Sequence, residues 1–188
     1  MRLTEARVAP VSDEAATARQ MEIMKSRGAN GGLNVYRTMV NVPDLAEAFL
    51  TWGGYVLSDR NDLPGRQREI LVLRTGYLCR SGYEWTQHVR VGKRMGLTDE
   101  EIVWIKEGAG AKGWSAADAT LIRVADELHA HQFISEATWA ELGAHFTPKQ
   151  MMDAIFTCGQ YTQVSMFLNT CGVQLDPGQV LDPDLKAY

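Results

Sequence analysis

The feature of this sequence that is best suited to acid/base chemistry is a glutamate and a histidine four residues apart. Glu84 and His88 would lie on the same face of a helix, with their Cβ atoms about 5 to 6 Å apart. At that distance a carboxylate and an imidazole can share a proton, and histidine is the side chain whose charge changes near neutral pH. The spacing therefore predicts a pair that transfers protons.

A second glutamate, Glu69, belongs to the preceding segment 64–79, in which apolar residues recur at helical spacing. A turn at Ser81-Gly82 separates this segment from the one that carries Glu84 and His88. Two helices joined by so short a turn can pack as a hairpin, which would bring Glu69 towards the pair. The order of the residues permits a site of three residues but does not require one.

Glu84 also has a purely structural interpretation. The run Ser81-Gly82-Tyr83-Glu84 fits the capping box S-x-x-E. In that motif the serine side chain accepts from the third backbone N–H of the helix, and the glutamate bonds back to the serine N–H. Glu84 would then only start a helix, and the sequence leaves both interpretations open.

Four short motifs extend the pattern: Arg68-Glu69, Cys79, Tyr83-Glu84-Trp85-x-x-His88 and Gly96-Leu97-Thr98-x-Glu100-Glu101-Ile102. Together they resemble the carboxymuconolactone decarboxylase and alkylhydroperoxidase D-like family, over roughly residues 33 to 175. The peroxidase branch of that family has a glutamate, then C-x-x-C, then a histidine four residues after the second cysteine. Glu69 and His88 match that glutamate and histidine. Ser81 and Glu84 stand at the two cysteine positions, so this sequence resembles a branch with Tyr-Glu-Trp-x-x-His in place of C-x-x-C.

The missing thiols bear directly on function. A thiol peroxidase needs a low-pKa thiolate and normally a second cysteine that resolves the sulfenic acid. The cysteines of this chain are Cys79, Cys158 and Cys171, and none of them belongs to a C-x-x-C motif. Cys79 lies two residues before Ser81 and could act alone, although a single cysteine in an apolar helix is more often a small buried residue.

The resemblance implies an enzyme similar to the carboxymuconolactone decarboxylases, a lyase that needs neither a cofactor nor a metal. Its substrate would be a small lactone, keto acid or unsaturated carboxylic acid, changed by decarboxylation or by proton-transfer isomerisation. Such chemistry needs an acid or base beside the reacting carbon and positive groups near the developing oxyanion. We expect His88 to shuttle the proton, Glu69 to be the orienting or relaying partner of His88, and Glu84 to act as a second acid/base group. Three further residues are expected at the substrate: Tyr83, Ser81 and Cys79.

Two alternatives come from other functional classes. The first is a peroxidase-like antioxidant protein with peroxiredoxin-type activity, which would use Cys79. The second is a non-catalytic helical oligomer that binds a small ligand. Turnover and its dependence on Glu84, His88 or Cys79 would distinguish the three.

Other patterns argue against further partners. The sequence shows no glycine-rich phosphate motif or nucleophile elbow, so it implies no organic cofactor, and His129 and His131 would point to different faces of a helix rather than form a metal pair. A net charge of −4 at pH 7 argues against nucleic acid as a partner. No apolar run approaches the roughly 18 to 20 residues that span a bilayer, so no membrane contact is expected. Three cysteines without zinc-like spacing predict a cytoplasmic protein with reduced thiols.

The elements that must position these residues are predicted to be helices. With 188 residues, of which 45% are hydrophobic and 22% charged, the chain suits one soluble domain. Helix-start residues such as Pro43, Thr98 and Thr147 recur, and no segment shows the period-two alternation of a strand. The sequence therefore predicts an all-α, single-domain bundle of about seven to nine helices.

The family resemblance refines this expectation. It implies a helical bundle of the alkylhydroperoxidase D-like type and a homo-oligomer, either a trimer or a hexamer. We expect the chain to divide into an N-terminal arm and helix at residues 1–32, the helical domain of the family at 33–175 and an extended C-terminal tail at 176–188. Of these parts, the central domain carries the expected site.

Overall fold

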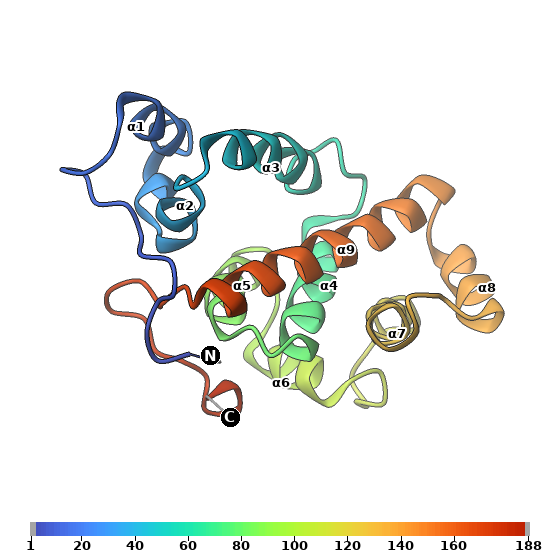
Figure 1. Cartoon of the computed structure of the whole chain (residues 1–188). Coiled ribbons are helices and arrows are strands. Elements are labelled where there is room, and N and C mark those ends of the chain that lie inside the picture. The colour runs from blue at the N-terminus through green and yellow to red at the C-terminus, as the bar shows by residue number, and fades with distance from the viewer. Residues whose placement is uncertain (1–2, 187–188) are drawn as a thin grey trace.

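The computed structural model describes residues 3–186, and in that range the chain forms only helices and loops (Figure 1). Nine α-helices and two short 3-10 helices occur there. Their bounds are α1 Ala18–Lys25, η1 Gly28–Gly32, α2 Asn34–Met39, α3 Pro43–Val56, α4 Gly65–Leu78, α5 Gly82–Arg94, α6 Asp99–Glu107, α7 Ala116–His131, α8 Glu136–His145, α9 Pro148–Cys171 and η2 Pro183–Leu185. The predicted all-α fold is confirmed, and the count of helices is at the upper end of the expected range.

The expected helix starts follow from local chemistry. The side chains of Thr98 and Thr147 accept from the third backbone N–H of α6 and α9, and both helices also have the reciprocal bond of a capping box. Pro148 stands at the first position of α9, where a backbone N–H would have no partner inside the helix. Gly172 follows α9 with a φ of +68°, which glycine adopts without steric cost.

Helix α4 is the centre of the fold. All of its residues from Glu69 to Gly76 are buried, and it packs against α5, α7 and α9. The main apolar cluster surrounds α4 and includes Ile70, Leu73, Leu121, Ile122 and Leu142. Burial of each such side chain stabilises the fold by roughly 1.5 to 3 kcal/mol before the cost of ordering the chain is counted. A carboxylate on so deeply buried a helix needs partners, and Glu69 is such a residue.

The first three helices form a separate layer, drawn in blue and cyan on one side of α9 in Figure 1. This layer has its own small apolar cluster of buried side chains: Ile23, Met24, Met39, Val40 and Ala46. Helix α3 packs against α9 and so joins the layer to the rest of the molecule. We call α1, η1, α2 and α3 the N-terminal layer.

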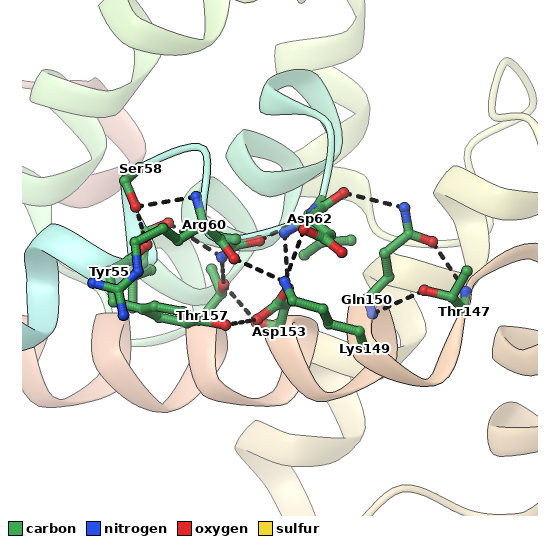
Figure 2. Close-up of polar contacts among 12 residues, drawn as sticks. Tyr55, Ser58, Arg60, Asp62, Thr147, Lys149, Gln150, Asp153 and Thr157 are labelled. Carbon is green, nitrogen blue, oxygen red and sulfur yellow. Dashed lines mark hydrogen bonds and ion pairs between the residues drawn. The ribbon is translucent and has the colours of Figure 1, made fainter.

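A polar network, shown in Figure 2, fastens the loop before α4 to helix α9. The Asp153 carboxylate accepts from the hydroxyl of Tyr55 at 2.7 Å and from the backbone N–H of Asp62 at 2.8 Å. The Lys149 ammonium lies 3.1 Å from a carboxylate oxygen of Asp153 and 2.8 Å from one of Asp62. We call Tyr55, Asp62, Lys149 and Asp153 the Asp153 network. It fixes the point at which the chain enters α4.

The segment after α9 folds back on its own chain. Among residues 173–186 there is one short helical turn, η2, and the remainder is irregular. Asp182 accepts from the indole N–H of Trp85 at 3.1 Å and lies 2.7 Å from the Lys106 ammonium, while Leu185 is buried. The tail therefore packs on α5 and α6. The outermost residues of the expected arm and tail, 1–2 and 187–188, lie outside the described residues.

Within residues 3–186, none of the helices is both long enough and apolar enough to cross a membrane.

Candidate active site

The hairpin of α4 and α5 brings together the three residues that the sequence predicts to transfer protons. Glu69 comes from α4, and Glu84 and His88 come from α5. Nδ1 of His88 lies 2.7 Å from Oε2 of Glu69, and Nε2 of His88 lies 3.0 Å from Oε1 of Glu84. We call these residues the Glu69–His88–Glu84 cluster. The imidazole is held between two carboxylates, one from each helix.

The capping-box interpretation of Glu84 is wrong. Ser81 stands at the N-cap of α5, but its side chain makes no capping hydrogen bond, and its buried hydroxyl has no hydrogen-bond partner. The Glu84 side chain turns along the helix to His88, because the imidazole offers a charged donor one turn away. A partner further along the helix thus takes the carboxylate that a capping box would use at the helix start.

Burial and the neighbouring charges shift the pKa of His88 in opposite directions. The side chains of Glu69, Glu84 and His88 are 2%, 7% and 12% exposed. Burial lowers the pKa of His88, but the two neighbouring carboxylates outweigh it and raise the pKa from its ordinary value to about 10. Nδ1 faces a carboxylate oxygen that can only accept and so carries a proton, and the raised pKa of His88, with the Glu84 carboxylate 3.0 Å from Nε2, keeps Nε2 protonated as well. At neutral pH His88 is therefore an imidazolium.

Tyr161 of α9 is a fourth member of the site, and the sequence analysis missed it. Its hydroxyl oxygen lies 3.3 Å from Nε2 of His88, and the two rings meet edge to face with centroids 4.9 Å apart. Tyr161 is only 4% exposed, and burial, followed by the charges of Glu84 and Glu69, raises its pKa well above the ordinary value. Tyr161 is therefore a neutral phenol. In the sequence it is one of many large residues in a mostly apolar helix.

A cavity of about 520 Å³ lies beside the cluster, a volume typical of small-molecule sites. Its wall includes Glu69, Glu84, His88 and Tyr161. The N-terminal layer supplies the opposite, mainly apolar wall, which includes Leu33, Val35, Tyr36, Phe49, Leu50 and Gly53. The cavity thus lies between the N-terminal layer and helices α4, α5 and α9, and the Glu69–His88–Glu84 cluster lies in the wall that these three helices form.

Four arginines also line this cavity: Arg27, Arg68, Arg90 and Arg94. None of them forms an ion pair with an acidic side chain among residues 3–186. Nε of Arg27 and Nε of Arg68 are buried without a hydrogen-bond partner. The cavity is therefore cationic although the chain carries a net charge of −4. Sequence reasoning missed this because Arg27 and Arg68 are far along the chain from the pair Arg90 and Arg94.

The three residues expected at the substrate lie in different places. Tyr83 lines the cavity, but its hydroxyl donates to Asp176 at 2.7 Å and so does not point a free donor at a substrate. Ser81 is fully buried and is absent from the cavity wall in the described part of the chain. Cys79 stands at the other end of α4, with its sulfur 3.8 Å from Nδ1 of His129, and it too is outside the wall. Of the three residues expected at the substrate, Tyr83 thus lines this cavity and Ser81 and Cys79 do not.

No cysteine lines the cavity among the described residues. Cys158 is buried in α9, and burial raises the pKa of its thiol to about 12, which keeps it protonated. In the same part of the chain, no group of three or more His, Cys, Asp or Glu residues is placed so that it could hold a metal ion. The ionisable groups that the cavity offers are carboxylates, an imidazolium, phenols and guanidinium groups.

Comparison with known proteins agrees with the family that the sequence resembles. The sequence profile of the carboxymuconolactone decarboxylase family matches residues 43–127, a range that includes Glu69, Glu84 and His88. No curated protein matches the chain in sequence.

Several solved structures share the fold. The debrominase Bmp8, solved as a cysteine-to-alanine variant with 2,3,4-tribromopyrrole, has a TM-score of 0.74 at 14% identity, over 93% of this chain and 94% of its own. An uncharacterised peroxidase-related protein from Ralstonia eutropha JMP134, with an alkylhydroperoxidase AhpD core, has a TM-score of 0.73 at 18% identity, over 89% and 87%. Another, from Silicibacter sp. TM1040, has a TM-score of 0.74 at 15% identity, over 93% and 91%. The alkylhydroperoxidase D-like bundle is thus confirmed as the fold.

Proposed function

We propose that this chain, a member of the carboxymuconolactone decarboxylase family, is an acid/base enzyme that acts on the anion of a small carboxylic acid. The observation that carries the proposal is the Glu69–His88–Glu84 cluster in the wall of a cavity that has no cysteine among its described lining residues. The reaction would be a decarboxylation or a proton-transfer isomerisation of a lactone, keto acid or unsaturated acid. Both reactions need only groups that the cavity wall supplies.

The geometry supports a division of roles within the cluster. Both nitrogens of His88 are engaged by carboxylates, so the imidazolium exchanges protons with the substrate through one of them. Glu84 has the more accessible side chain, 7% exposed against 2% for Glu69. We therefore assign Glu84 as the group that exchanges protons with the substrate and His88 as the proton reserve behind it. Glu69 holds Nδ1 and fixes the orientation of the ring.

In the isomerisation, Glu84 would remove a proton from the carbon beside the carbonyl group. The C–H bond breaks, its electron pair forms an enolate, and the return of the proton to another carbon completes the reaction. In the decarboxylation, the bond to the carboxylate carbon breaks, carbon dioxide leaves and the electron pair forms the same kind of enolate. A proton then passes from His88 through Glu84 to the carbon. In both cases the negative charge that develops on the enolate oxygen must be stabilised.

The arginines support an anionic substrate. Arg27 and Arg68 have buried Nε–H groups without partners, and an unsatisfied buried donor costs about 1 to 3 kcal/mol. A substrate carboxylate would satisfy such donors with charge-assisted hydrogen bonds. Arg90 and Arg94, both exposed at the cavity, add positive charge that attracts an anion. The substrate class proposed from the sequence therefore fits the charge of the cavity.

The two alternative functions receive less support from the geometry. A peroxidase needs a reactive thiol beside its acid/base residues, whereas Cys79 lies outside the cavity wall next to His129. A ligand-binding protein without catalysis would use the cavity but would not need the cluster. Unchanged ligand affinity in Glu84→Gln and His88→Ala, together with no turnover, would favour that function.

The test is proton NMR in D₂O on a panel of muconolactones, β-keto acids and α,β-unsaturated acids. We expect the wild type to introduce deuterium into a panel compound or to decarboxylate it, and Glu84→Gln to do neither. Glu141→Gln is the matched control, because Glu141 lies half-exposed on α8 and outside the cavity wall. No reaction of the wild type with any compound, or an equal rate in Glu84→Gln, would contradict the proposal.

We also propose that the protein is a cytoplasmic homo-oligomer, a trimer or hexamer, with neither nucleic acid nor a membrane as a partner. Large apolar side chains on the surfaces of α3 and α9 support self-association, namely Trp52, Met152, Phe156 and Met166. Light scattering of the purified chain would test the oligomeric state, and a monomer at micromolar concentration would contradict it.

A further inference from the structure

The hydrogen bonds of His88 determine what Tyr161 can do. A carboxylate can only accept, so the contact of Nδ1 with Glu69 and that of Nε2 with Glu84 each need a proton on the ring nitrogen. Nε2 therefore has no lone pair left for the phenol hydrogen of Tyr161. At a separation of 3.3 Å, the Tyr161 oxygen receives a hydrogen bond from Nε2 rather than donating one to it. The hydrogen of the Tyr161 hydroxyl must therefore point away from His88.

No other hydrogen bond of Tyr161 occurs among residues 3–186. Its side chain is 4% exposed and lines the cavity, so the hydroxyl hydrogen is a buried donor without a protein acceptor. Burial, reinforced by Glu84 and Glu69, keeps the group protonated, because its pKa lies well above the ordinary value. A neutral phenol with a free hydrogen, which itself receives a hydrogen bond from an imidazolium, is a strong donor.

The neighbouring residue adds an independent observation. Gln160 lines the same cavity and is only 5% exposed, and its side-chain carbonyl oxygen is buried without a hydrogen-bond partner. Two consecutive residues of α9 therefore present unsatisfied polar atoms at this cavity, one a donor and the other an acceptor. Unsatisfied buried polar groups are rare in folded proteins, and their occurrence together at a cavity indicates a polar ligand.

We propose that Tyr161 is a catalytic residue that donates its hydroxyl hydrogen to the oxyanion of the bound substrate. This inference rests on the proposed function and extends it, because it names the group that stabilises the enolate. Glu84 and the Tyr161 hydroxyl both lie within hydrogen-bond distance of one nitrogen, Nε2 of His88. The base Glu84 and the donor Tyr161 are thus adjacent. An enolisable substrate requires this arrangement, because its α-carbon, which loses the proton, is next to its carbonyl group, whose oxygen becomes the oxyanion.

The charges of the step balance. When Glu84 takes the α-proton, one negative charge leaves the carboxylate and appears on the enolate oxygen. The hydroxyl of Tyr161 donates to that oxygen, and the imidazolium that bonds to the Tyr161 oxygen strengthens the donation. Arg68 acts in the same direction, since its charge opposes the rise in the pKa of Tyr161 and so favours negative charge near the phenol. No proton needs to leave Tyr161 during the reaction.

The experiment uses 4-nitrophenolate as a stable analogue of a planar oxyanion and 4-nitroanisole as its neutral counterpart. Their binding to the full chain is measured by calorimetry and by absorbance at about pH 8.5, where 4-nitrophenol is ionised and His88 is still charged. We expect Tyr161→Phe to weaken phenolate binding about tenfold or more, the usual effect of losing a hydrogen bond to a charged group. The affinity for 4-nitroanisole should change by about twofold or less.

Tyr55→Phe is the matched control, because it removes the same hydroxyl group from a tyrosine that donates to Asp153 and lies outside the cavity wall. It should bind phenolate like the wild type, and thermal unfolding of Tyr161→Phe should show an intact fold. Three results would overturn the inference: no phenolate binding by the wild type, equal binding by Tyr161→Phe, or an equal loss for 4-nitroanisole. If phenolate binding depends on Tyr161 but no panel compound exchanges a proton, the proposed reaction fails and the oxyanion site stands.

Discussion

The Asp153 network and the Glu69–His88–Glu84 cluster both hold carboxylates that are almost fully buried, yet they are built differently. Asp153 receives a hydroxyl, a backbone N–H and an ammonium group, and Lys149 balances its charge. In the cluster, two carboxylates share one imidazolium, and the cavity next to them holds unsatisfied donors. Burial of a carboxylate is thus no sign of function by itself. An incomplete set of partners beside a cavity is the informative feature.

The largest effect should come from removing a proton-transfer group. We expect Glu84→Gln to lower the rate of deuterium exchange by at least about 100-fold, the usual contribution of general acid–base catalysis. Its free energy of unfolding should stay within about 1 kcal/mol of the wild type, because the change also removes the repulsion between two buried carboxylates. Exchange kinetics and urea unfolding of the same preparation check both parts. A large loss of stability would instead show that Glu84, like Asp153, has a structural role.

The reverse pattern is expected for Asp153→Ala. This change leaves the Tyr55 hydroxyl and the Asp62 N–H without their acceptor, so we expect a loss of about 2 to 3 kcal/mol in the free energy of unfolding. Binding of 4-nitrophenolate to the folded fraction should be retained, since none of these three residues lines the cavity. Lys149→Met is the control: Lys149 is half-exposed, and its loss should cost about 1 kcal/mol or less.

The two regions should also lose their contributions to stability at opposite ends of the pH scale. The folded pKa of His88 is raised to about 10, so its contribution is complete below its ordinary value near 6.5 and is lost as the pH rises through 10. Burial raises the pKa of Asp153, but the hydrogen bonds from Tyr55 and Asp62 and the charge of Lys149 together outweigh burial and lower the pKa. Its contribution is present above the ordinary value of 3.8 and is lost as the pH falls.

Urea unfolding across pH measures both trends. His88→Gln should remove the alkaline decline relative to the wild type and leave the acid decline unchanged, while Asp153→Asn should do the opposite. The same alkaline decline in His88→Gln as in the wild type would show that His88 does not hold its proton in the folded state.

The smallest effect is expected at Cys79, the residue that caps the C-terminal end of α4. Cys79→Ser should leave the exchange rate within about twofold of the wild type, because the residue lies outside the cavity wall. Peroxide consumption by the wild type, if any, should likewise be no greater than that of Cys79→Ser. Rapid turnover of peroxide that disappears in Cys79→Ser would instead support a peroxidase.

The sequence predicted the parts of the site that depend on local spacing. The pairing of Glu84 and His88 follows from helical geometry, whereas the short turn between the two helices permits Glu69 to reach them but does not require it. For Glu84 the sequence allowed both a pair with His88 and a capping box with Ser81. In the structure Glu84 pairs with His88, one helical turn away, and makes no capping bond with Ser81. Tyr161 and Arg27 could not be predicted, because they reach the cavity from opposite ends of the chain through tertiary packing, which leaves no local pattern.

Asp176, in the tail, has a consequence for how the protein is made. Its carboxylate accepts from the backbone N–H of Asn34 at 2.7 Å, the Tyr83 hydroxyl at 2.7 Å and the Gln87 amide at 2.6 Å. It therefore ties the N-terminal layer to α5 next to the cavity. During synthesis on the ribosome, helices α1 to α8 emerge before α9 brings Tyr161 and before Asp176 can make these bonds. The cavity wall is thus completed late in translation, and a nascent chain that stops short of Asp176 should fold its core before it can bind a ligand.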